Sequence, residues 1–198
     1  MCIRDRVLNQ NDLLFIGAGN RKFNQSYVVI ESKGIKFSFL GYCESGFENA
    51  KEGVFINRID GSNIVRDIKN LKLQSDVVII SLHWGIENVF YPSPRQIDLV
   101  HKLIDSGATI ILGYHPHVVQ GIEKYKNGLI VYSLGSFQFK AERGKSKKSI
   151  ILSVEISKSG IERYEIIPVR INENFLPCIM AVSYTHLRAH ETSLHLVC

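Results

Sequence analysis

The chain has 198 residues, of which 45% are hydrophobic and 22% are charged, and its formal net charge is +5. This length and composition indicate one folded domain, or at most two small ones, and exclude disordered, collagen-like and low-complexity proteins. The longest purely aliphatic run, residues 77–80, is far shorter than the roughly 20 residues that cross a bilayer, and residues 1–6 contain no apolar signal segment.

The excess of basic residues does not indicate nucleic-acid binding, because these residues are scattered along the chain. Their densest cluster, at residues 140–148, lies between two strand-like runs and is expected to be a solvated turn. The cysteines show neither C-x-x-C nor zinc-ribbon spacing, so we expect free thiols and no pairing of Cys43 with Cys178.

The two ends of the chain differ in character from the middle. Residues 1–6 and residues 183–198 both resemble translated sequencing-adapter sequence. The tail contains His186 and His190 at i, i+4 spacing, which on a helix would suit a metal, but it sustains neither a helical nor a strand period. We therefore expect both ends to be non-native and residues 7–182 to carry the structural information.

In chain order, the first elements are short strands and one helix. An apolar run at residues 13–16 ends at Gly17, and β-branched and aromatic runs at residues 27–30 and 35–40 flank Lys33-Gly34, which predicts a hairpin. A helix is predicted to start at Asp60-Gly61-Ser62, because the apolar residues that follow share one helical face: Ile64, Ile68 and Leu71.

Buried strands and a second helix follow. Residues 77–82 predict a strand covered on both faces, and a helix capped by Ser93, with Pro94 in its first turn, is predicted to end at Gly107. One face of this helix is apolar, with Ile97, Val100 and Ile104. Further strands are predicted at residues 108–112, 129–134, 150–156 and 161–171, the last two joined by a turn at 158–160. Strand–helix–strand units followed by hairpins predict an α/β sandwich with a mixed sheet.

Histidines follow two of the buried strands. His83 comes directly after the strand at 77–82, and His115 and His117 follow the strand at 108–112. Ligands of open α/β sheets gather outside the carboxyl ends of the strands, so both loops are expected at one rim. In an extended segment His115 and His117 would project to the same side, with Pro116 favouring that geometry, and neutral imidazoles bind zinc, manganese or iron.

Each of these residues also has a structural interpretation. A single histidine after a strand is commonly a hydrogen-bonded residue of the surface or core, and H-P-H alone is a weak motif. Trp84 and Tyr114 are expected to pack at the base of the loops, and Glu87 is expected to be solvated unless His83 is a ligand. For His101, packing or exposure on its helix is the expected role.

Four segments resemble a known family: DVVIISLHWGIE at residues 76–87, RQIDLVHKLIDSG at 95–107, ILGYHPHVVQGIE at 111–123 and VYSLGSF at 131–137. Together they resemble the capsule-synthesis protein CapA family, also called poly-γ-glutamate biosynthesis proteins, of the calcineurin-like metallophosphoesterase superfamily. GAGN at residues 17–20 and GIKFSFLGY at 34–42 also fit, with lower specificity.

The resemblance implies a metallophosphoesterase-like α/β sandwich of mixed β-sheets flanked by helices, with residues 7–182 as the C-terminal part of one domain, incomplete at the N-terminus. It implies a two-metal site in which His83 and His115 bind one divalent ion (Mn, Fe or Zn) and His117 binds the other. Such ions, about 3.5–4 Å apart, activate a bridging water for phosphoryl transfer. Glu87 matches the acidic residue after the first histidine loop, and its implied catalytic role is orientation of a ligand or proton transfer.

For function, the resemblance implies an accessory protein of capsule or poly-γ-glutamate synthesis at the cell envelope, membrane-anchored or extracellular, with the polymer-synthesis machinery as its partner. Two alternatives use the same fold. One is a metal-dependent phosphoesterase of unknown substrate, and the other is a catalytically silent scaffold or binding module.

Two departures from the family pattern change these expectations. The Asp-x-His, Gly-Asp and Asn-His motifs of the superfamily are missing from the sequence, and Ser136 stands where the family usually has Asn. Without a bridging carboxylate, imidazoles cannot offset the repulsion between two metal ions. We therefore predict that this chain binds at most one divalent ion, weakly, and has no phosphoesterase activity.

Overall fold

The structure is a computed structural model that describes residue 11 and residues 13–20, 27–44, 54–138 and 147–180. The predicted non-native ends, residues 1–6 and 183–198, lie outside the described residues, as does most of the predicted basic turn. Among the described residues, no helix has the length and apolar character needed to cross a membrane.

Two helices and several strands alternate along the described part of the chain. The helices are α2 (Gly61–Lys72) and α3 (Pro94–Asp105). The strands are β1 (Ala18–Asn20), β2 (Tyr27–Ser32), β3 (Ile35–Cys43), β4 (Val54–Ile56), β5 (Val77–His83), β6 (Ile110–Tyr114), β7 (Ile122–Tyr125), β8 (Gly128–Val131), β9 (Lys148–Ser157), β10 (Gly160–Ile171) and β11 (Pro177–Ile179).

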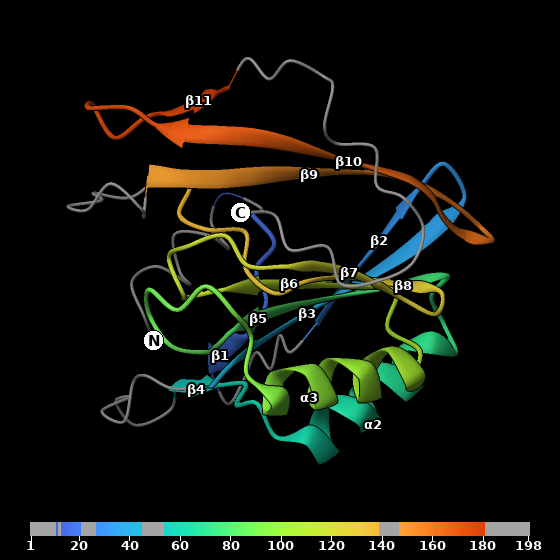
Figure 1. Cartoon of the computed structure of the whole chain (residues 1–198). Coiled ribbons are helices and arrows are strands. Elements are labelled where there is room, and N and C mark those ends of the chain that lie inside the picture. The colour runs from blue at the N-terminus through green and yellow to red at the C-terminus, as the bar shows by residue number, and fades with distance from the viewer. Residues whose placement is uncertain (1–10, 12, 21–26, 45–53, 139–146, 181–198) are drawn as a thin grey trace.

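A six-stranded mixed sheet forms the centre of the molecule, with the order β2-β3-β5-β6-β8-β7. Its four inner strands run parallel, and β2 and β7 pair antiparallel at the two edges. Both helices cover one face of this sheet, and a three-stranded sheet of order β11-β10-β9 lies over the other face (Figure 1). The predicted α/β sandwich of mixed sheets is therefore confirmed.

Both helices begin and pack as their sequences predict. The Asp60 carboxylate caps α2 by accepting from the Ser62 backbone N–H at 3.0 Å. Ser93 and Gln96 form a reciprocal capping box at the start of α3. The apolar faces of the two helices join the helix-side residues of β3, β5, β6 and β8 in the main core. These helix residues are Ile64, Ile68 and Leu71 of α2 and Val100, Leu103 and Ile104 of α3.

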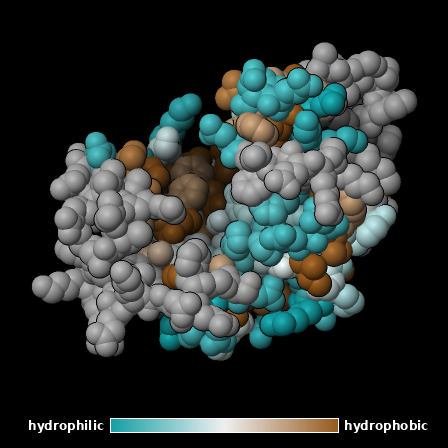
Figure 2. All heavy atoms as spheres, turned by 90° about the vertical axis from the view of Figure 1, so that its left-hand side faces the viewer, coloured by the Kyte–Doolittle hydropathy of each residue, from teal (hydrophilic) through white to brown (hydrophobic). Residues whose placement is uncertain are grey.

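A second core lies between the two sheets. It joins Ile122, Leu129 and Val131 of the six-stranded sheet to Ile150 of β9, with half-buried residues of β9 and β10 packed around them. This core lies over the β6-β8-β7 side of the large sheet. On the face turned toward the viewer in Figure 2, the molecule is hollowed, and hydrophobic side chains lie at the bottom of the hollow.

Some element boundaries differ from the prediction. Residues 13–16 are irregular, and the strand there begins only at Ala18. β6 begins at Ile110, two residues after the predicted start, and β8 ends at Val131. Sequence reasoning missed β4, β7 and β11, which have three or four residues each. Segments this short cannot show the alternation that identifies a strand.

Candidate metal site

The two histidine loops leave the sheet at the same edge. β5 ends at His83, and in the parallel register His83 lies beside Tyr114, the last residue of β6. On its other side, His83 pairs with Cys43 at the end of β3. The expectation that both loops open on one rim of the sheet is confirmed, because neighbouring parallel strands end side by side.

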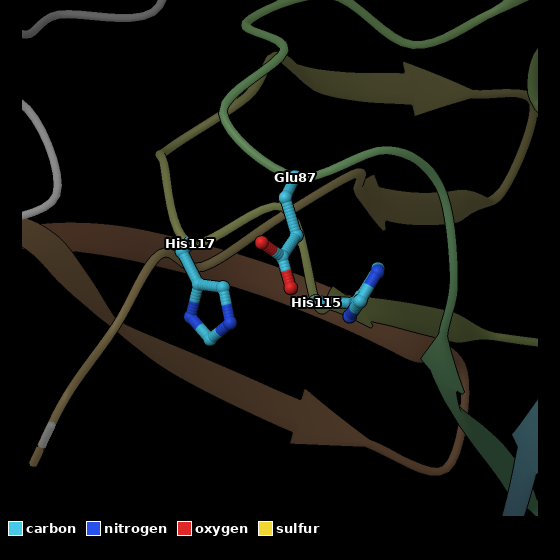
Figure 3. A group of neighbouring side chains, drawn as sticks. All are labelled: Glu87, His115 and His117. Atoms are coloured by element: carbon cyan, nitrogen blue, oxygen red, sulfur yellow. The ribbon is translucent and has the colours of Figure 1, made fainter. Parts of the chain in front are cut away.

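Three side chains converge at this rim. Glu87, His115 and His117 each offer one ligand atom, and these atoms all lie within 4.8 Å of one another (Figure 3). Histidine nitrogen and carboxylate oxygen are the donors that zinc, manganese and iron accept, so the residues present fit a divalent metal. Glu87, expected to be solvated, is exposed and faces the two imidazoles.

His83 lies next to this group. Its ring centroid is 4.7 Å from that of His115, and the His115 and His117 ring centroids are 6.1 Å apart. Desolvation, followed by the nearby imidazoles of His115 and His117, lowers the pKa of His83. A lowered pKa favours the neutral imidazole, which is the form that binds a metal. The structure thus brings all four predicted site residues together, with His83 beside the cluster of the other three.

The backbone of the H-P-H segment is not extended, and the prediction on this point is wrong. His115 has φ of 98° and His117 has φ of 59°, so both lie in the left-handed region that non-glycine residues rarely enter. The carbonyl oxygen of Pro116, between them, accepts from the Asn88 N–H at 2.8 Å. A bend, held by a hydrogen bond from a neighbouring loop, therefore brings the two imidazoles together. The alternation of side chains along a strand plays no part.

Close packing fixes the base of both loops. Trp84 is buried. Its backbone N–H donates to the Tyr114 carbonyl at 3.1 Å, and its indole Nε1–H donates to the Tyr132 carbonyl at 3.2 Å. A Cβ on Gly113 would lie 1.8 Å from that same Tyr132 oxygen, so only glycine fits there. The packing role expected of Trp84 is confirmed.

The loop that carries Glu87 is tied to the loop that carries the histidines. Besides the Asn88–Pro116 bond, the buried Gln120 donates from Nε2 to the Val89 carbonyl at 2.8 Å. On the other side, the Gly85 N–H donates to the Glu44 carboxylate at 2.9 Å. These bonds place Glu87 opposite His115 and His117.

Two residues near the site were not identified from the sequence as functional. Ser136 was noted only as a departure from the family pattern, yet its hydroxyl lies 3.0 Å from Nδ1 of His117. Gln120 gave no signal, because the local sequence does not show that its side chain reaches Val89 in the other loop. By contrast, His101 packs as expected: its Nε2 lies 2.8 Å from the Glu123 carboxylate, and its ring stacks on Tyr125.

Comparison with known sequences gives a consistent result. The model of the family described as "Bacterial capsule synthesis protein PGA_cap" matches residues 5–141. The chain is 31% identical over 176 residues to "Capsule biosynthesis protein CapA" of Bacillus anthracis, covering 85% of this chain and 43% of that protein. It is 32% identical over 171 residues to "PGA biosynthesis protein CapA" of Bacillus subtilis, covering 83% of this chain and 44% of that protein. The chain therefore spans less than half the length of these relatives.

Comparison with solved structures supports the fold. A phosphatase from Mycoplasma pneumoniae superposes with a TM-score of 0.57 at 14% identity, covering 83% of this chain and 66% of the phosphatase. At this identity the likeness concerns the fold alone. The expected α/β sandwich of mixed sheets flanked by helices is thus a fold that this solved phosphatase shares.

Proposed function

Because the chain belongs to the bacterial capsule synthesis protein family PGA_cap, we propose that the protein is an accessory factor of capsule or poly-γ-glutamate synthesis that works at the cell envelope. Its sequence similarity to two proteins named for capsule and PGA biosynthesis supports this assignment. The polymer-synthesis machinery is the proposed partner.

The proposed site binds one divalent ion at the rim of the large sheet. The observation that carries this proposal is the convergence of Glu87, His115 and His117 within 4.8 Å, with His83 beside His115. In this arrangement His115, His117 and the Glu87 carboxylate would hold the ion, with His83 beside His115. A divalent ion there would supply a Lewis acid for a phosphoryl or carbonyl oxygen.

The charge of the donor set limits the site to one ion. Among the residues that the structure describes, Glu87 is the one carboxylate in the cluster, and the other donors are imidazoles. Two divalent ions about 4 Å apart repel strongly, and a bridging carboxylate is the usual means of offsetting that repulsion. The proposed role of this chain is therefore binding, with no phosphoester hydrolysis.

A titration tests the metal site. The chain is stripped with a chelator and titrated with Mn²⁺ and Zn²⁺ by calorimetry, together with the variants Glu87→Gln and His115→Ala. Binding is expected in the parent chain, at least tenfold weaker in Glu87→Gln and lost in His115→Ala. His101→Gln is the matched control, because His101 lies outside the cluster and bonds to Glu123. Equal affinity in all four proteins would contradict the site.

The polymer role requires a test in cells. The chain is expressed in Bacillus subtilis cells with and without the polymer-synthesis machinery, and the share of the chain in the membrane fraction is measured. We expect the parent chain to associate with the membrane fraction of polymer-producing cells through the synthesis machinery. Association that is unchanged in cells lacking that machinery would contradict the proposed partner.

A further inference from the structure

Ser136 faces the imidazole of His117 from the side opposite the metal cluster. Its hydroxyl oxygen lies 3.0 Å from Nδ1 of His117, and the residue is only 5% exposed. Figure 3 shows the second ring nitrogen of His117, Nε2, on the side of Glu87 and His115. The two nitrogens of this imidazole therefore have separate partners, a hydroxyl on one side and the cluster on the other.

The position of the Ser136 hydroxyl is set by backbone contacts around Leu134. The Leu134 N–H donates to the Gly113 carbonyl at 3.1 Å, and the Leu134 carbonyl accepts from Ser149 Oγ at 2.9 Å. Gly135 has φ of 79°, and a Cβ there would lie 2.8 Å from the Lys148 carbonyl oxygen. Since β6 and β9 hold this turn from both sides, the hydroxyl has little freedom to move away from His117.

A neutral imidazole carries its proton on one nitrogen and a lone pair on the other, and only the lone pair binds a metal. The Glu87 carboxylate accepts hydrogen bonds and cannot donate them, so in the absence of metal it favours a proton on Nε2. That tautomer cannot bind an ion in the cluster through Nε2. The Ser136 hydroxyl beside Nδ1 can accept from Nδ1–H or donate to an unprotonated Nδ1, and in the accepting role it acts in the opposite direction, because it favours the proton on Nδ1.

We infer that Ser136 is a positioning residue that accepts a hydrogen bond from Nδ1–H of His117 and so keeps the Nε2 lone pair directed at the cluster. The effect of Ser136 on metal affinity rests on the proposed metal site, whereas its effect on the tautomer of His117 does not. Asn, the residue expected here from the family pattern, can serve the same purpose, because its carboxamide oxygen also accepts a hydrogen bond.

The variants Ser136→Ala and Ser136→Asn separate this role from a structural one. Ser133→Ala is the matched control, because Ser133 is a buried serine in the same segment after β8, but its hydroxyl accepts from the Gly135 N–H. Long-range ¹⁵N–¹H NMR of the metal-free protein, under alkaline conditions where imidazoles are neutral, reports which nitrogen of His117 carries the proton. Calorimetry with Zn²⁺ reports the affinity of the site.

We expect the Nδ1–H tautomer in the parent chain, Ser133→Ala and Ser136→Asn, and a shift towards Nε2–H in Ser136→Ala. Zinc affinity should fall about tenfold or more in Ser136→Ala and return in Ser136→Asn. The same tautomer in the parent chain and in Ser136→Ala would overturn the inference, as would Nε2–H in the parent chain. If the parent chain bound no zinc, the proposed metal site would fail while the tautomer measurement still decided the role of Ser136.

Discussion

Gly113 shows how a single position shapes the site. It lies in β6, just before the histidine loop, and a methyl group at its Cα would overlap the Tyr132 carbonyl oxygen and approach Trp84 Nε1 to 2.8 Å. Because both neighbours are fixed in the core, the strand would have to move away, and it would carry His115 with it.

We therefore expect Gly113→Ala to lower the free energy of unfolding by at least about 2 kcal/mol, as overpacking in a core does. Urea unfolding followed by tryptophan fluorescence measures this change. Gly121→Ala is the control, since a Cβ there meets nothing within 4 Å. Equal losses in the two variants would show that close approach is not the reason for glycine at position 113.

At the scale of residues, sequence reasoning placed His83, His115 and His117 at one rim because parallel strands end at a common edge, whereas the role of Glu87 came from the family resemblance. It could not predict how the H-P-H segment bends. Proline biases the preceding residue towards extended geometry, yet His115 adopts φ of 98°, where the Asn88–Pro116 hydrogen bond from another loop holds the segment. A tertiary contact of this kind leaves no local signal in the sequence.

At the scale of elements, α3 is a helix whose start is encoded locally. The Ser93 hydroxyl accepts from the Gln96 N–H, and the Gln96 side chain accepts from the Ser93 N–H at 3.0 Å. We expect Ser93→Ala to destabilise the protein by about 1 kcal/mol, because one N–H of the first turn loses its acceptor. Chemical denaturation measures the loss, and Ser106→Ala, at the C-terminal end of the same helix, should cost less.

The start of α2 depends on pH through Asp60. The Asp60 carboxylate accepts hydrogen bonds from the Ser62 hydroxyl and from the Ser62 backbone N–H, and these, in that order, lower the pKa of Asp60 below its ordinary value. The folded-state pKa is thus below that of the unfolded chain, so the stabilisation is present above the unfolded value and is lost as pH falls through the folded value. The stability advantage of the parent chain over Asp60→Asn should therefore be larger at about pH 7 than at about pH 3. An advantage independent of pH would contradict this explanation.

The helices and long strands could be predicted because each is long enough to repeat its period. Ile64, Ile68 and Leu71 are all buried, and the Lys33-Gly34 turn joins β2 to β3 as expected. β7 was missed because its four residues, IEKY, give two apolar positions and no clear alternation. It pairs with β8 across a short turn, with Tyr125 opposite Gly128, and this pairing is not encoded in the four residues of β7 themselves.

At the scale of the whole molecule, the sandwich gathers His83, His115, His117 and Glu87 at one rim of its large sheet. The two helices pack on one face of this sheet. On its other face, β9 stabilises the turn that carries Ser136. The composition of this cluster, with imidazoles in excess of carboxylates, is the basis of the proposal that it binds at most one divalent ion. Residues 7–182 remain the predicted native part of the chain. Cys43 and Cys178 are not joined by a disulfide.

The most direct test is to count metal ions in the purified chain while assaying hydrolysis. The chain is reconstituted with Mn²⁺ or Zn²⁺, freed of excess metal, and analysed by mass spectrometry for metal content and with a phosphodiester for turnover. We predict at most one ion per chain, absent in His115→Ala, and no turnover above that variant. Two equivalents of metal together with turnover would contradict the account.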